Sequence, residues 1–180
     1  MEGEEVLLGI VDLSIALIGF SSIVTALRRS KERAWSPQEI NGLVFLATMS
    51  IGAILFSLLP FPLFHIGLTG HQIYSISSWA YLVYGIGTFA ALFIRARTKG
   101  FPSRRPRVFN TFAFLSIIIL VMMFMVASGN IASGLLGYYL LGVIWLLVLA
   151  FVQFLVFLSY VGFVGEEHSA ESERKGVNPT

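Results

Sequence analysis

The 180-residue chain contains no cysteine, and only 12% of its residues are charged. The lack of cysteine excludes disulfide bonds, thiolate metal sites and a cysteine nucleophile. The low charge excludes an ordinary soluble domain, because such domains carry about a quarter of their residues as Asp, Glu, Lys and Arg. Hydrophobic residues instead make up 56% of the chain. At about 20 apolar residues for each membrane crossing, this length supplies several transmembrane helices and leaves no room for a separate soluble domain.

Five long apolar segments follow one another along the chain, each without lysine or arginine. Their length favours transmembrane helices, which satisfy their own backbone hydrogen bonds in lipid. Barrel strands are excluded because the segments lack the alternation of lipid-facing and lumen-facing residues. We therefore predict an all-α polytopic transmembrane bundle. Its transmembrane domain covers residues 1–165, with helices over about 6–27, 38–64, 73–94, 108–126 and 135–164.

All twelve lysine and arginine residues fall on one side of this five-helix topology. The positive-inside rule assigns that side to the cytoplasm. We therefore expect an N-terminus outside, a cytoplasmic C-terminus, and a disordered polar tail over residues 166–180. The basic residues are Arg28, Arg29, Lys31, Arg33, Arg95, Arg97, Lys99, Arg104, Arg105, Arg107, Arg174 and Lys175.

Two prolines interrupt the second apolar segment near its end. Proline has no amide hydrogen, so Pro60 frees the carbonyl oxygen of Phe56 and Pro62 frees that of Leu58. We expect a kinked or irregular helix end there. Such breaks form ion or substrate sites in some transporters, but water or a neighbouring helix also satisfies freed carbonyls at a membrane interface.

Asp12 is the one carboxylate well inside a predicted span. It lies about 9 Å along the helix axis from Val6, in the outer half of the membrane. An acid at the centre of a transmembrane helix costs about 2.5 to 3.5 kcal/mol, and less at this depth, so a partner or water is expected nearby. Ser57 and Tyr81 lie at similar depth. Asp12 therefore either fixes helix packing through a hydrogen bond or takes part in the binding of a proton or a cation.

Small residues share one helix face with Asp12. Small faces let helix backbones approach closely in lipid. We expect this face to be buried against another helix, with Asp12 pointing into the bundle. The small residues are Gly9, Ala16, Gly19, Ser22 and Ala26.

The third predicted helix carries a second polar stripe, formed by Ser77, Tyr81, Tyr84 and Thr88 at helical spacing. These hydroxyl groups either bond neighbouring helices or line a hydrated path. We take Asp12, Ser57 and this stripe together as the candidate intramembrane polar site.

Other classes of function find little support in the sequence. His65 and His71 lie near the outer membrane face and His168 lies in the tail, so no metal-binding set assembles on one side. The chain has no catalytic triad motif and no glycine loop for phosphate, so we expect neither an enzyme nor a cofactor. The basic loop from Arg95 to Arg107 is explained by topology and by attraction to anionic lipid, so we expect no nucleic-acid partner.

The first half of the chain resembles a group of small bacterial multi-helix membrane proteins of uncharacterised function. The resemblance rests on VDLSIALIGFSSIV, AWSPQEINGLV, SLLPFPLFHIGL and YSISSW. It extends to an acid at the position of Asp12. It implies a bacterial inner membrane location and supplies no substrate, cofactor or reaction.

The sequence therefore leaves two classes of function open. The leading hypothesis is a small bundle in the lipid bilayer that self-assembles as a homo-oligomer or binds partner membrane proteins. The alternative is a small transporter or channel-like protein that uses Asp12 and the polar stripe of the third helix.

Overall fold

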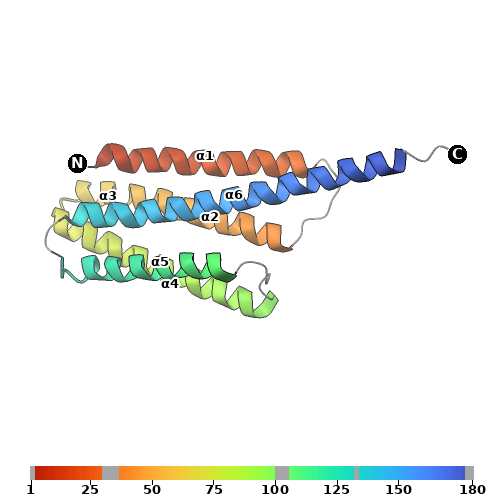
Figure 1. Ribbon diagram of the computed structural model, residues 1–180. Helices are drawn as coiled ribbons and strands as arrows, with labels where there is room; N and C mark the ends of the chain where they lie inside the picture. The colour runs from red at the N-terminus through yellow and green to blue at the C-terminus, as the bar shows by residue number, and fades with distance from the viewer. Residues whose placement is uncertain (1–2, 30–36, 100–105, 132–133, 177–180) are drawn as a thin grey trace.

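The computed structural model describes the backbone of residues 3–29, 37–99, 106–131 and 134–176. Within these ranges the protein is an all-helical bundle of five long helices and one short helix, α3, and each long helix runs antiparallel to the long helix before it (Figure 1). The helices are α1 (Glu4–Arg29), α2 (Pro37–Leu58), α3 (Pro60–His65), α4 (Gly70–Lys99), α5 (Pro106–Ala127) and α6 (Leu135–Gly176).

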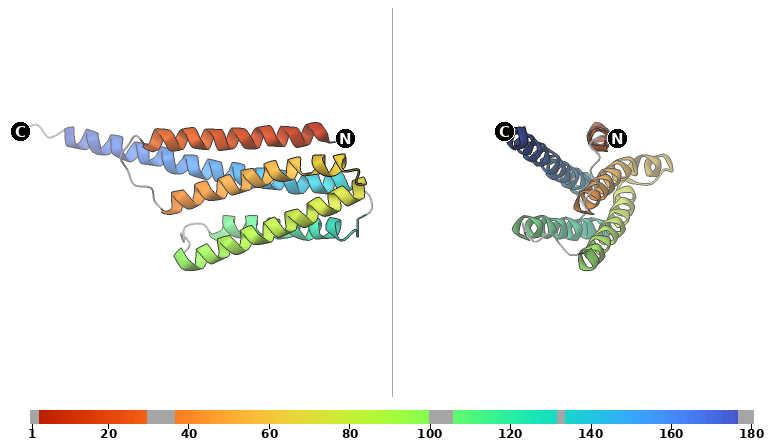
Figure 2. Two further views of the ribbon diagram at one scale, coloured as in Figure 1. Left: turned by 180° about the vertical axis from the view of Figure 1, so that it is seen from behind. Right: turned by 90° about the vertical axis from the view of Figure 1, so that its right-hand side faces the viewer.

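The bundle is built around the contact between α2 and α6. α1 packs on one side of this pair, while α4 and α5 pack against each other on the other side (Figure 2). Over the described residues α1 contacts only α2 and α6, and it does not reach α4 or α5. α1 is therefore an outlying helix, with one face against the bundle and one face directed away from it.

Three described helical segments are long and apolar enough to cross a membrane: Glu4–Ala26, Ile40–His65 and Leu135–Ser159. The apolar part of α5, Thr111–Ala127, is shorter than such a span, and the described part of α4 is not among the three. α4 is less apolar because it contains several serine and tyrosine residues. The buried ones are Tyr74, Ser77, Ser78 and Tyr81. The protein is therefore a transmembrane helical bundle with three helices that meet this criterion.

Glycine residues let neighbouring helices come close. A Cβ added at Gly52 of α2 would lie 2.7 Å from the Tyr84 ring, and one at Gly42 would lie 2.8 Å from Nε2 of Gln153 on α6. In lipid, helix association depends on close packing because the apolar surroundings offer no hydrophobic driving force. Gly52 and Gly42 therefore set how closely α4 and α6 approach α2.

The expected irregularity at the prolines is confirmed. The helix over 38–64 is divided at Leu59, and α3 begins with Pro60. Leu59 keeps helical backbone angles, so the chain passes from α2 into α3 without a wide loop.

Two other helix ends follow local signals. Before α4, the amide and hydroxyl of Thr69 both donate to Oε1 of Gln72, so the helix begins at Gly70 rather than at the predicted residue 73. After α5, Gly129 has a φ of 74°, which side-chain-bearing residues rarely adopt. Its amide donates to Val126 O and that of Asn130 donates to Met125 O, the pattern of a Schellman cap.

The prediction of a disordered tail over 166–180 was wrong for its first part, because α6 continues to Gly176. Residues 166–176 include four glutamates and one each of Ala, Arg and Lys, all of which favour helices. Arg174 and Lys175 occupy the last turn, where positive charge complements the helix dipole, and glycine follows them. Residues 177–180 lie outside the described residues.

Candidate functional site

α1 has two faces of opposite character. Its inner face packs on α2 and α6 and consists of residues spaced alternately by three and four. This spacing keeps successive side chains on one side of a helix over several turns. The inner face is Leu7, Ile10, Ser14, Leu17 and Ser21, all of them buried.

Asp12 lies on the opposite side of α1 and is exposed. The expectation that it points into the bundle was therefore wrong. At 3.6 residues per turn, Asp12 is on the far side of the helix from Ser14 and Leu17, which α2 and α6 cover. Among the described residues none forms a hydrogen bond or ion pair with its carboxylate.

The small residues around Asp12 are exposed as well, so the expectation of a buried small-residue face was also wrong. A Cβ added at Gly9 or Gly19 would meet no other atom within 4 Å. The exposed residues on this side also include the large apolar residues Leu8 and Ile15. We use the name outer face of α1 for Glu5, Gly9, Asp12, Ala16, Gly19 and Ile23.

The polar stripe of α4 lies on the other side of the α2–α6 pair from the outer face of α1. The Tyr81 hydroxyl donates to the Gly142 carbonyl of α6 at 2.9 Å, and the Tyr84 hydroxyl donates to the Thr48 carbonyl of α2. Ser77 is fully buried close to Tyr139, while Thr88 is half-buried. Tyr81 and Tyr84 thus hold α4 against two neighbouring helices.

Ser57 is fully buried in α2 and, like Tyr81, does not meet the exposed Asp12. Among the described residues its hydroxyl has no hydrogen-bond partner, and the same holds for Ser14 and Ser50. Ser14 and Ser21 on α1, and Ser50 and Ser57 on α2, each recur after seven residues. This repeat, which we did not predict from the sequence, consists of buried residues, and small side chains of this kind allow helices to approach closely.

The carbonyl freed by Pro60 has a specific partner. Phe56 O accepts a hydrogen bond from the hydroxyl of Tyr139 on α6. Tyr139 is fully buried, and its ring lies 5.6 Å from that of Tyr74. The proline break is therefore stabilised by a neighbouring helix, in line with one of the two alternatives that the sequence left open.

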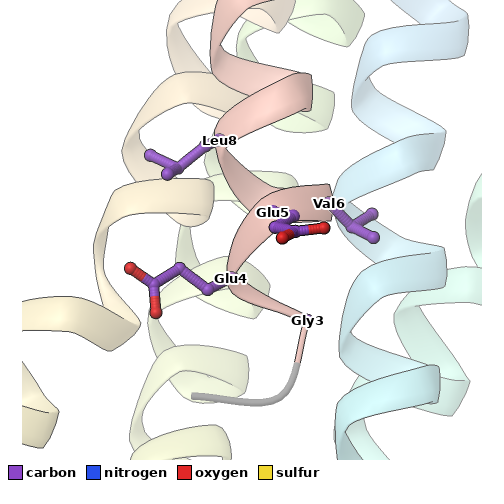
Figure 3. A pocket seen from close by; sticks show the side chains of 5 residues that line it. All are labelled: Gly3, Glu4, Glu5, Val6 and Leu8. Atoms are coloured by element: carbon purple, nitrogen blue, oxygen red, sulfur yellow. The ribbon is translucent and has the colours of Figure 1, made fainter.

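Two shallow hollows lie on α1. The first has a volume of about 470 Å³ and is lined by Gly3, Glu4, Glu5, Val6 and Leu8 (Figure 3). The lining residues are Gly3 and four residues of the first turns of α1, so the hollow is not assembled from several elements. The second, of about 470 Å³, lies between α1 and α2 and is lined by Ile18, Ser21, Ser22, Thr25, Ala26, Leu43, Leu46 and Ala47.

The structure thus separates the predicted site into parts. Asp12 is on the outer face of α1, whereas Ser57, Ser77 and Tyr81 are buried in the bundle. In the described residues no group of three or more His, Asp or Glu side chains has the arrangement of a metal site. Comparison of the chain with protein-family models, curated proteins and solved structures gave no match.

Proposed function

We propose that the protein is a membrane-embedded assembly protein that binds another transmembrane helix through the outer face of α1. One observation carries the proposal: Asp12 is exposed on that face, inside a helix long and apolar enough to cross a membrane. A carboxyl group facing lipid is costly, and polar residues within transmembrane segments normally face a partner or a hydrated cavity.

The surroundings of Asp12 favour a helix as the partner. Gly9, Ala16 and Gly19 leave the α1 backbone accessible on both sides of the carboxylate. Helices that approach over small residues gain van der Waals contacts, and a polar side chain between them gains a hydrogen bond. The outer face therefore has the composition of a helix-packing surface.

We further infer a location in the bacterial inner membrane with five membrane crossings, the N-terminus outside and the C-terminus in the cytoplasm. The ends of α1, α4 and α6 and the starts of α2 and α5 lie at one end of the bundle (Figure 1). In the sequence, all lysine and arginine residues flank these ends. Basic residues gathered at one end support this orientation.

The alternative, transport along a path from Asp12 to the α4 stripe, has less support from the geometry. α2 and α6 separate α1 from α4 over the described residues. Tyr81 and Tyr84 already donate their hydroxyl hydrogens to backbone carbonyls. A path through Asp12 and these tyrosines would therefore require the central helices to move apart.

Site-specific photo-cross-linking in intact membranes tests the proposal. One photoreactive residue replaces Ala16 on the outer face of α1. The control replaces Val83 of α4, a residue that is also exposed (71%) but lies on another helix. We expect an adduct of defined mass from position 16 that Asp12→Leu removes, and none from position 83. Adducts of equal yield from both positions, or no adduct from position 16, would contradict the proposed function.

A further inference from the structure

We propose that the hollow between α1 and α2 is a lipid site, which holds an acyl chain of phosphatidylglycerol and places the phosphate of that lipid beside the last turn of α1. The residues that line this hollow are not those of the outer face of α1. The inference therefore goes beyond the proposed function and does not depend on it.

The hollow lies where α1 and α2 move apart. The two helices are closer together near the start of α1 than near its end, where α2 begins (Figure 2). The space between them has a volume of about 470 Å³, and its lining contains no charged side chain and no aromatic ring. Leu43, Leu46 and Ala47 line it from α2, and Ile18 and Ala26 are the apolar residues that line it from α1. Such a lining suits a hydrocarbon chain.

The length and the depth of the hollow match one leaflet of a membrane. From Ile18 to Ala26 the helix rises by about 12 Å, and half of the hydrocarbon core of a bilayer is about 15 Å thick. Ala26 is the last residue of the first apolar span, and Leu43 lies close to the start of the second span at Ile40. The hollow therefore runs from near the middle of the membrane to one of its surfaces, as the acyl chain of a lipid does.

Three hydroxyl groups of α1 also line the hollow, those of Ser21, Ser22 and Thr25. Each of them donates its hydrogen to the backbone carbonyl four residues earlier in α1. A donor that is already bonded within its own helix loses no partner when an apolar group covers it. The hydroxyl groups are therefore compatible with an acyl chain in the hollow.

Basic residues follow at the open end of the hollow. α1 continues beyond the lining to Arg29, which comes four residues after Thr25 and therefore occupies the same side of the helix one turn later. From Arg28 to Glu39 the sequence has four basic and two acidic residues. This excess of positive charge complements the phosphate of phosphatidylglycerol, which carries a net negative charge, and favours it over phosphatidylcholine, which carries none.

Native mass spectrometry of the full-length chain in detergent micelles tests the site, with phosphatidylglycerol and phosphatidylcholine of identical acyl chains as probes. We expect the chain to bind phosphatidylglycerol about fivefold more tightly than phosphatidylcholine. Ala47→Phe fills the hollow and should lower the affinity for phosphatidylglycerol about tenfold. The matched control is Ala90→Phe on α4, where the residue is exposed and lies at a similar distance from the basic end of its helix, so the affinity should not change. Equal affinities for the two lipids, or equal affinities of the two variants, would overturn the inference.

A second pair of variants tests the phosphate contact and leaves the hollow as it is, so the test does not depend on the folding of Ala47→Phe. We expect Arg29→Gln to weaken the binding of phosphatidylglycerol about fivefold and to leave that of phosphatidylcholine unchanged. Arg97→Gln removes the same charge from the last turn of α4 and should have little effect on either lipid. Equal losses from Arg29→Gln and Arg97→Gln would show a diffuse attraction to the basic end of the bundle and would overturn the inference.

Discussion

At Gly52 the backbone of α2 lies directly against the side chain of Tyr84. A methyl group at this position would sit 2.7 to 2.9 Å from three atoms of the tyrosine, including its hydroxyl oxygen. The same hydroxyl donates to Thr48 O, one turn earlier in α2. The ring has little freedom to retreat, because it also packs against Phe56 with centroids 5.4 Å apart. Glycine is therefore required here for the hydrogen bond and for the packing of α4 on α2.

We expect Gly52→Ala to destabilise the protein by about 1 to 3 kcal/mol, the usual cost of overpacking a filled interior. The matched control is Gly87→Ala on α4, where an added Cβ meets no other atom within 4 Å, so stability should be unchanged or slightly raised. Reversible unfolding in mixed detergent micelles measures both variants. Equal stability of the two would contradict the close approach of Tyr84 to Gly52.

Among the elements, the break between α2 and α3 depends both on a local feature, a proline, and on a residue far away in the sequence, a tyrosine of α6. Pro60 removes the amide that would bond Phe56 O, and Tyr139, 83 residues after Phe56, donates to that oxygen. The freed carbonyl was predictable from the position of the proline alone. Its partner was not, because no local pattern tells which helix lies next to α2 at this depth.

A double-mutant cycle on Pro60 and Tyr139 tests this arrangement. We expect Tyr139→Phe to cost about 0.6 to 1.7 kcal/mol, the average and the maximum found by double-mutant cycles for hydrogen bonds between transmembrane helices. In a Pro60→Ala background the restored amide bonds Phe56 O, so Tyr139→Phe should cost less. Additive effects of the two substitutions would show that the tyrosine hydroxyl does not serve the carbonyl freed by proline.

Sequence reasoning also misjudged the direction of α1, and the cause lies in its composition. Small residues occur on both sides of this helix: serines recur on the inner face and glycines and alanines on the outer face. The presence of small residues therefore does not decide which side of α1 packs against the bundle. Asp12 was assigned to the inside because it shares a face with small residues, and close packing over small residues does not require the partner helix to belong to the same chain.

For the whole molecule, the antiparallel order of the long helices places the two chain termini at opposite ends of the bundle (Figure 2). The apolar segments and the basic loops were enough to predict an all-helical bundle. The arrangement of α1 against α2 and α6, and of α4 with α5, depends on contacts between residues far apart in the chain and was not predictable from hydropathy.

The proposed orientation gives a prediction for the chain as a whole. Asn130→Cys lies in the exposed connection between α5 and α6, at the same end as the start of α1. We expect a membrane-impermeant maleimide to label it in intact cells, because basic residues at the other end hold that end in the cytoplasm. A cysteine added after Thr180 should be labelled only after lysis, and the reverse result would mean the opposite orientation.

The length of α6 has a practical consequence. The helix continues from the end of its apolar segment at Ser159 to Gly176 without interruption, a rise of about 25 Å beyond the span. A soluble helical protein fused in frame to this extension would be joined by unbroken backbone hydrogen bonds and would hold a fixed direction relative to the bundle. Such a rigid attachment gives a 19.9 kDa membrane protein the added mass that particle alignment in electron cryomicroscopy requires. The extension of α6 therefore offers an attachment site for a fusion partner that would make the protein large enough to image.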